Sequence, residues 1–426
     1  MIRRLLWALL ALLLLAAALV WAWNFWGTPS LDESPPTTPP NSDQVARGAY
    51  LARVGNCMLC HTERGGTPYA GGRAIETPFG TVYSSNITPD AATGIGGWSA
   101  GYFRRALQEG RSRDGRLLYP AFPYPHMTLV TANDADALFD YLRSLPPANK
   151  PNRAHRLRWP YSTQAALAVW RVLYFRPEKF EEDATHTPEW NRGAYLVRGL
   201  AHCGACHTAR NALGGSSDLT DLSGGLIPMQ NWYAPSLSSA SEAGTADWPL
   251  AEIEQLLSTG IAPRATTSGP MAEVVLNSLQ YLEPGDIRAM AVYLKSLPPT
   301  PGDTDPLEVR NPTDQVLSRG SKIYKDRCIE CHGDRGQGVP NAYPALARNR
   351  QVTLPVTANL VQVVLHGGFA PATRRNPKPF GMPPFATQLS DADVAAVLSY
   401  VRASWGNRAS PVSEFEVAQQ RSSARP

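Results

Sequence analysis

Three copies of one pentapeptide, Cys-x-x-Cys-His, constrain this chain more than any other feature. They are Cys57-Met-Leu-Cys60-His61, Cys203-Gly-Ala-Cys206-His207 and Cys328-Ile-Glu-Cys331-His332, and they contain all six cysteines of the chain. A structural zinc site needs paired sets of ligands, whereas each of these pairs lies in its own stretch of sequence. Disulfides within Cys-x-x-Cys close loops too short to stabilise much, and neither alternative explains the histidines.

The same spacing is the signature of covalent attachment of a c-type haem. Two thiols on one helical turn can each add to a vinyl group of the same haem, and the adjoining histidine then faces the iron. We therefore expect three covalently bound haems c. The attaching and proximal residues are expected to be Cys57, Cys60, His61, Cys203, Cys206, His207, Cys328, Cys331 and His332.

Internal repeats set the expected domain plan. Arg47-Gly-Ala-Tyr-Leu51 and Arg192-Gly-Ala-Tyr-Leu196 precede the first two motifs, and Arg319-Gly-Ser-Lys-Ile-Tyr324 precedes the third. Each unit closes with a helical pattern that contains Tyr141, Tyr293 or Tyr400 near its end. The expected N-cap residues of these three closing helices are Thr131, Glu283 and Ser390, in the same order. The sequence thus predicts a mainly α fold with three tandem domains of one plan, at 44–147, 189–299 and 315–408. With their attachment motifs these domains resemble class I cytochrome c domains.

The remaining segments are expected to connect or anchor these domains. Residues 1–26 are expected to form an uncleaved N-terminal transmembrane helix, because Leu5 to Trp23 carries no charge and bulky aromatics follow where a signal peptidase would need small residues. The alternative is a signal sequence that is removed by cleavage near Ala16 to Ala18. Residues 27–43 form a Pro-rich tether. Residues 148–188 form a connecting insert whose helix, from Gln164 to Phe175, packs across the junction. Residues 300–314 form a linker, and 409–426 a flexible tail.

The sixth ligand of each iron decides whether it is closed for electron transfer or open for catalysis. Met382 and Met271 stand in the expected loops before the closing helices of their units and are the expected thioether ligands. In the first unit Phe122 stands where a methionine is expected, and His126 and Met127 follow it. Met127 is favoured slightly, since it would make all three sites alike, while an open iron is a further alternative.

The chain resembles the three-haem cytochrome c subunits of membrane-bound, periplasmic dehydrogenases, of the alcohol, gluconate, sorbitol and aldehyde dehydrogenase type. The likeness rests on Thr77-Pro-Phe-Gly80, Ser85-Asn-Ile-Thr88, Leu118-Tyr-Pro-Ala-Phe-Pro-Tyr124, His202-Cys-Gly-Ala-Cys-His207 and Trp232-Tyr-Ala-Pro235. It implies His61, His207 and His332 as proximal ligands and Met271 and Met382 as distal ones. The departure at Phe122 leaves the ligand of the first haem open.

This resemblance implies a non-catalytic electron-transfer subunit. Its expected partners are a catalytic dehydrogenase subunit (molybdenum enzyme, quinoprotein or flavoprotein), a small iron–sulfur or accessory subunit, and ubiquinone or another respiratory acceptor. The expected location is the periplasmic side of the bacterial inner membrane, held by the single N-terminal anchor, because Arg3 and Arg4 stay in the cytoplasm.

The sequence also bears on two other classes of function. A formal net charge of +4 without a dense basic stripe argues against nucleic acid. The alternative function is a haem enzyme with an exchangeable site at the first haem, doing peroxidase-like chemistry or oxidising sulfur compounds.

Overall fold

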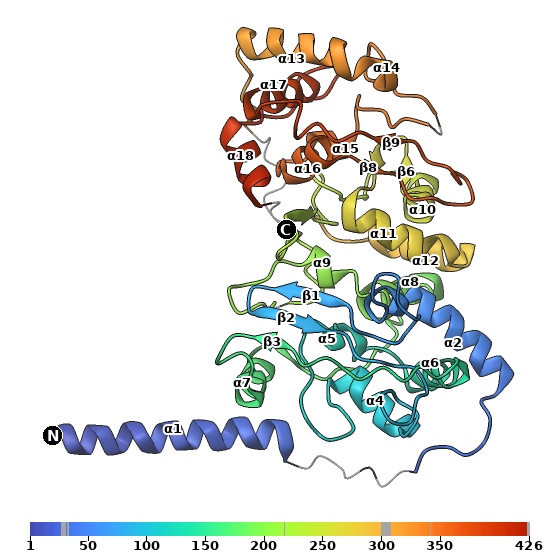
Figure 1. Cartoon of the computed structure of the whole chain (residues 1–426), viewed down its shortest axis with the longest axis vertical. Helices are drawn as coiled ribbons and strands as arrows, with labels where there is room; N and C mark the ends of the chain where they lie inside the picture. Colours follow the sequence, from blue (N-terminus) through green and yellow to red (C-terminus); the bar gives the residue numbers. More distant parts are fainter. Residues whose placement is uncertain (27–30, 32–33, 217, 300–307, 341, 424–426) are drawn as a thin grey trace.

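The computed structural model describes residues 1–426 except 27–30, 32–33, 217, 300–307, 341 and 424–426 (Figure 1). Helices dominate the described residues and the strands are short, which confirms the mainly α class. Parts of the predicted tether, of the 300–314 linker and of the tail lie outside the described residues.

The first helix is the anchor candidate. Helix α1 (Ile2–Phe25) projects from the body with almost every side chain exposed (Figure 1). It is the one helix among the described residues that is long and apolar enough to cross a membrane. Its 24 residues extend about 36 Å at 1.5 Å per residue, which exceeds a hydrocarbon core of about 30 Å.

The first unit packs two long helices around shorter elements. Its elements are α2 (Ser42–Val54), α3 (Cys57–Cys60), β1 (Ala74–Thr77), β2 (Gly80–Tyr83), α4 (Ala100–Glu109), α5 (Tyr124–Met127) and α6 (Ala132–Ser144). Thr131 caps α6 as predicted, because its hydroxyl accepts a hydrogen bond from the backbone N–H of Asp134.

The connecting insert contributes to both neighbours. Its strand β3 (Arg156–Leu157) pairs antiparallel with β2 and extends the sheet in the order β1-β2-β3. Its helix α7 (Gln164–Tyr174) contacts the first unit through the rings of Trp170 and Tyr124. The Trp170 Nε1–H donates to the Leu213 carbonyl of the second unit, so α7 does pack across the junction.

The second and third units repeat the plan of the first. The second contains α8 (Pro188–Ala194), the π-helix η1 (Tyr195–Leu200), α9 (Gly204–His207), β4 (Gly225–Ile227), β5 (Trp232–Ala234), α10 (Leu250–Thr259), β6 (Ile261–Ala262), β7 (Ala265–Thr266), α11 (Gly269–Asn277), the 3₁₀ helix η2 (Leu279–Tyr281) and α12 (Pro284–Lys295). The third contains α13 (Asp314–Arg327), α14 (Ile329–His332), α15 (Arg350–Thr353), α16 (Ala358–His366), β8 (Gly368–Phe369), β9 (Gly381–Met382), α17 (Asp391–Arg402) and α18 (Glu414–Ser423).

The C-terminal segment corrects the prediction of a flexible tail at 409–426. Helix α18 packs on the third unit: Val412 and Val417 are buried in its core, and the Arg421 guanidinium pairs with Asp391 at 2.6 Å. A capping box starts the helix, since Ser413 Oγ and Glu416 exchange hydrogen bonds with each other's backbone N–H. The two buried valines and this box outweigh the polar composition that suggested a frayed end.

One close contact recurs in all three units where the opening helix crosses the closing helix. A Cβ added at Gly48, Gly193 or Gly320 would come well inside 3.0 Å of a backbone carbonyl of the closing helix. Those carbonyls belong to Ala137, Ala289 and Ala396, and the β-carbons of Tyr141, Tyr293 and Tyr400 lie beside them. The three units therefore share one helix crossing that only glycine permits.

Replacing Gly193 with Ala should destabilise the second unit by about 1–3 kcal/mol, because the new methyl group forces α8 away from α12. The matched control is Gly285→Ala in α12, where an added Cβ meets nothing within 4 Å. That change should be neutral or stabilising by up to about 1 kcal/mol. Urea unfolding of both full-length variants checks this, and equal stabilities would contradict the crossing.

A reciprocal pair of tyrosine hydroxyls joins the first and second units. Tyr50 of α2 donates to Asp286 of α12 at 2.6 Å, and Tyr195 of the second unit donates to Asp134 of α6 at 2.6 Å. Each hydroxyl also accepts the backbone N–H at the start of the other unit's closing helix, from Glu283 and Thr131 respectively. Tyr50 thus satisfies the backbone N–H of Glu283, the N-cap residue of α12, whose own side chain makes no capping hydrogen bond.

Arginines of the same repeated motif complete this arrangement. Arg47 binds Asp134 within the first unit, and Arg192 binds Asp286 within the second with two hydrogen bonds of 2.8 and 2.7 Å. The third unit keeps the intra-unit pair, Arg319 with Asp393, but has Lys322 where the tyrosine would stand. Accordingly the first two units share one hydrophobic core, and the third has its own.

The Tyr50→Phe variant should lose about 1.5–3 kcal/mol of stability, because the Asp286 carboxylate loses a donor in a half-buried site. Burial raises the pKa of Asp286, but hydrogen bonds from Arg192 and Tyr50 outweigh it and leave that pKa lowered. The contribution of Asp286 should thus be complete above its unfolded pKa of about 3.9 and disappear as the pH falls through the lower folded pKa.

The free energies of unfolding of the unmodified protein and of Tyr50→Phe, compared between neutral pH and pH about 3, measure this loss. Tyr281→Phe serves as the control, since that side chain is largely exposed. If Tyr50→Phe costs no more than Tyr281→Phe at neutral pH, the hydroxyl bridge does not join the units.

Candidate haem-attachment sites

Each Cys-x-x-Cys-His motif forms a single helical turn directly after the opening helix of its unit. The turns are α3, α9 and α14. In the first two units the residue before the first cysteine of the motif, Asn56 or His202, adopts a left-handed conformation with φ of 50° and 43° respectively. All six thiols are free, so every pair is available for addition to a vinyl group.

The motif histidines are held in one tautomer. Their Nδ1 atoms lie 2.7 Å from the Ser85 carbonyl, 2.7 Å from the Pro235 carbonyl and 3.0 Å from the Pro344 carbonyl, for His61, His207 and His332 respectively. A carbonyl only accepts, so Nδ1 carries the proton and the Nε2 lone pair is left for a metal. Burial lowers the pKa of each of the three imidazoles, which favours the neutral, ligating form.

The third unit contains a cavity in which a haem could be held. An empty volume of about 790 Å³, its open mouth included, is lined by Cys328, His332 and Met382. The rest of the wall is mainly apolar, with Leu360, Val364, Phe385 and Val397 among its members. A thiol, an imidazole and a thioether around one apolar cavity are the donor set that a covalently attached haem needs.

In the second unit Met271 lies in the first turn of α11 rather than in an open loop. It is half-buried against the core shared by the first two units. Trp248 is fully enclosed in the same core, and its indole N–H has no hydrogen-bond partner. A buried indole N–H needs an acceptor, and an ionised haem propionate would supply one.

Trp248 is a candidate cofactor-contacting residue that the sequence analysis did not identify. The signal was present in the repeat: Trp98 stands two residues before α4, and Trp248 stands two residues before α10. Aligning the helix starts of the two units would have identified it.

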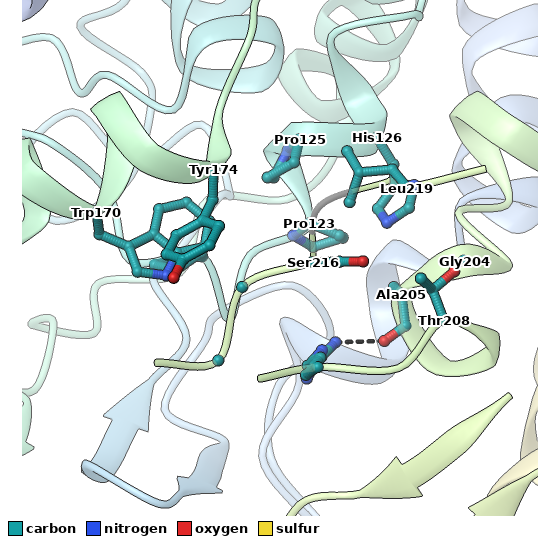
Figure 2. Close-up of a pocket in the computed structure, with 14 residues that line it drawn as sticks. Pro123, Pro125, His126, Trp170, Tyr174, Gly204, Ala205, Thr208, Ser216 and Leu219 are labelled. Atoms are coloured by element: carbon teal, nitrogen blue, oxygen red, sulfur yellow. Dashed lines mark hydrogen bonds between the residues drawn. The ribbon is translucent and has the colours of Figure 1, made fainter. Parts of the chain in front are cut away.

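The two candidates in the first unit point to different places. Figure 2 shows His126 directed toward the attachment turn α9 of the second unit, at Gly204 and its C-cap residue Thr208. An added Cβ at Gly204 would lie 2.8 Å from His126 Cε1, and burial together with the neighbouring His202 lowers the pKa of His126 to about 3. Met127 is instead buried at 4% exposure within the shared core.

The structure also shows the surroundings of Phe122 and His202. Phe122 is half-buried against the same core as Met127. His202 is half-buried directly before Cys203, and its Nδ1 is buried without a partner. The structure thus brings His126 and His202 together at the junction of the first two units.

Comparisons with known proteins agree with this geometry. A family model described as Cytochrome c matches residues 45–146 and 317–405. The chain is 37% identical over 405 residues to the cytochrome c subunit of alcohol dehydrogenase (quinone) from Gluconacetobacter polyoxogenes, covering 91% of this chain and 86% of that protein. It is 38% identical over 388 residues to the gluconate 2-dehydrogenase cytochrome c subunit from Pantoea cypripedii, covering 87% of each.

A third relative is much longer. The chain is 40% identical over 406 residues to one of the subunits of nicotinate dehydrogenase from Pseudomonas putida, covering 92% of this chain but only 32% of that protein.

Replacing Met382 with Ala should open the iron site of the third unit, because the thioether is the candidate ligand in that cavity. We expect the haem spectrum to change, one haem to bind carbon monoxide, and the potential of that haem to fall, since a methionine ligand raises it. Met229→Ala, at an exposed turn of the second unit, is the control. Absence of any new carbon monoxide binding in Met382→Ala would remove Met382 from the ligand set.

Proposed function

This chain belongs to the family of cytochrome c subunits of dehydrogenase complexes, and from that premise we propose that it holds three covalent haems c and relays electrons from a catalytic subunit to a membrane acceptor. The observation that carries the proposal is the threefold recurrence of one unit, each with the glycine crossing and an attachment turn. Covalent haem c follows from the family, while the number three rests on this repeat.

The proposed ligands follow the donor atoms of each unit. His61, His207 and His332 would bind through Nε2, since Nδ1 is engaged. Met382 and Met271 would close the third and second sites. For the first site we propose Met127, because His126 is directed toward the second unit. When bound, each haem supplies reversible one-electron transfer.

The protein's own side chains would keep these groups in a fixed arrangement. The Tyr50–Asp286 and Tyr195–Asp134 hydrogen bonds hold the first two units as one body. The third unit is joined to the second by polar contacts, among them two hydrogen bonds of 2.8 and 2.7 Å between Asn359 and the backbone of Tyr233. Covalent attachment and buried imidazoles would hold every cofactor at a constant position during transfer.

The proposed partner is a catalytic dehydrogenase subunit, as the names of the relatives imply for their own complexes. We expect the catalytic subunit to be a molybdenum enzyme, a quinoprotein or a flavoprotein. A small iron–sulfur or accessory subunit is a further expected member of the complex. We propose ubiquinone or another respiratory acceptor as the recipient. The body would lie on the periplasmic face of the inner membrane, with Arg3 and Arg4 in the cytoplasm.

The alternative of a haem enzyme with an exchangeable first site gains no support from the relatives, whose names describe cytochrome subunits. No specific contact in the described residues favours it over the relay.

The test is to purify tagged full-length protein from its native membranes in mild detergent, with its partners attached. Adding the substrate of the co-purifying catalytic subunit should reduce the haems; ethanol, gluconate, fructose and nicotinate are the first probes. The Cys328→Ser, Cys331→Ser variant should retain the partner and lose one haem. Substrate turnover by the complex while every haem stays oxidised would overturn the relay.

A further inference from the structure

The outer face of α7 is apolar and exposed, which is unusual for a helix on a protein surface. Ala165, Val169 and Leu173 recur at a spacing of four residues, so they line one side of the helix, and all three are exposed. Leu173 has 53% of its surface exposed, and Trp159, shortly before the helix, has 82%. Leu213 of the second unit, whose carbonyl accepts from Trp170 of α7, extends this surface with 43% exposure.

The opposite face of α7 is fixed to the end of the membrane anchor. The Asn24 side chain of α1 donates to the Ala168 carbonyl at 3.0 Å and accepts from Arg171 Nε at 3.0 Å. Val20 and Phe25 of α1 pack with Leu167 and Ala168 in a small hydrophobic cluster. Asn24 is buried at 4% exposure, so this docking is part of the folded body and does not depend on the tether.

This attachment sets the depth of α7 relative to a bilayer. Trp21, Trp23 and Trp26 are exposed near the end of α1, where a spanning helix places aromatic residues at the membrane surface. In Figure 1, α7 lies directly beside this end of α1, on the side of the body from which α1 projects. The contact between α1 and α7 therefore brings α7 to the level of the lipid headgroups.

The arginines that flank α7 suit a membrane surface that contains anionic lipids. Arg156 and Arg158 are exposed just before Trp159. Arg176 is exposed just after the helix, and its guanidinium lies 5.0 Å from the ring centroid of Trp23 in α1. An apolar stripe between flanking arginines is the pattern of helices that lie in the plane of a bilayer.

We propose that α7 is a second membrane contact: an interfacial helix whose Ala165, Val169 and Leu173 face, with Trp159, lies among the lipid headgroups and upper acyl chains. The occupant of this face is the bilayer and not the catalytic subunit. Because α7 also contacts the first and second units, the contact would fix the orientation of both above the membrane instead of leaving them to swing on a single helix.

Site-directed spin labelling of the full-length, haem-loaded chain tests this. Val169→Cys and Leu173→Cys would each carry a nitroxide, with Phe415→Cys on α18 as the exposed control and Leu13→Cys in α1 as the bilayer control. The purified chain is reconstituted without partners into vesicles of phosphatidylcholine and phosphatidylglycerol. The collision rates of each label with oxygen and with a water-soluble nickel complex are then compared.

Labels at positions 169 and 173 should collide more with oxygen than with nickel, as at position 13, whereas the label at position 415 should show the reverse. Haem absorbance equal to that of the unmodified chain shows that each variant has folded. Nickel-accessible labels at both 169 and 173 would overturn the proposal. If the catalytic subunit then protected those labels, the face would be a protein interface, and the relay itself would be unaffected.

Discussion

The hydrogen bond between a tyrosine of one unit and an aspartate of the next is the interaction on which the architecture depends. It occurs twice in opposite directions, through Tyr50 with Asp286 and Tyr195 with Asp134. Each hydroxyl joins an opening helix to the start of the other unit's closing helix, so the two units bury a common core. Where Lys322 replaces the tyrosine, the third unit has a separate core and a polar junction.

This asymmetry has a consequence for electron transfer. Two attachment turns belong to the units that share one core, and His126 of the first unit packs against the turn that carries Gly204 in the second. The third attachment turn belongs to a unit that is joined mainly through amide and backbone hydrogen bonds. We expect the first two haems to keep a constant separation and any relative motion to involve the third.

The sequence predicted the local features well, since these depend on residues close together in the chain. The attachment motifs fall on single turns, and Thr131 and Ser390 cap their helices as expected. The tyrosine bridge was not predictable, because the Arg-Gly-Ala-Tyr-Leu repeat shows the equivalence of two segments but not which unit each hydroxyl reaches. Two features carried a readable signal in the sequence: Trp248 stands at a repeated position, and α18 begins with a capping box. The loop position expected for Met271 was wrong, because helix α11 begins at Gly269.

Three equivalent units should each attach a haem, and the second unit is the best place to test this because the family model matches residues of the first and third units only. Its glycine crossing at Gly193 and its His207–Pro235 hydrogen bond are the same as those of its neighbours. The most direct measurement is the intact mass of the denatured chain, since haem c stays attached by thioether bonds. We expect the polypeptide mass plus three haems; a mass with two, or a peptide containing Cys203 and Cys206 without haem, would contradict three attachment sites.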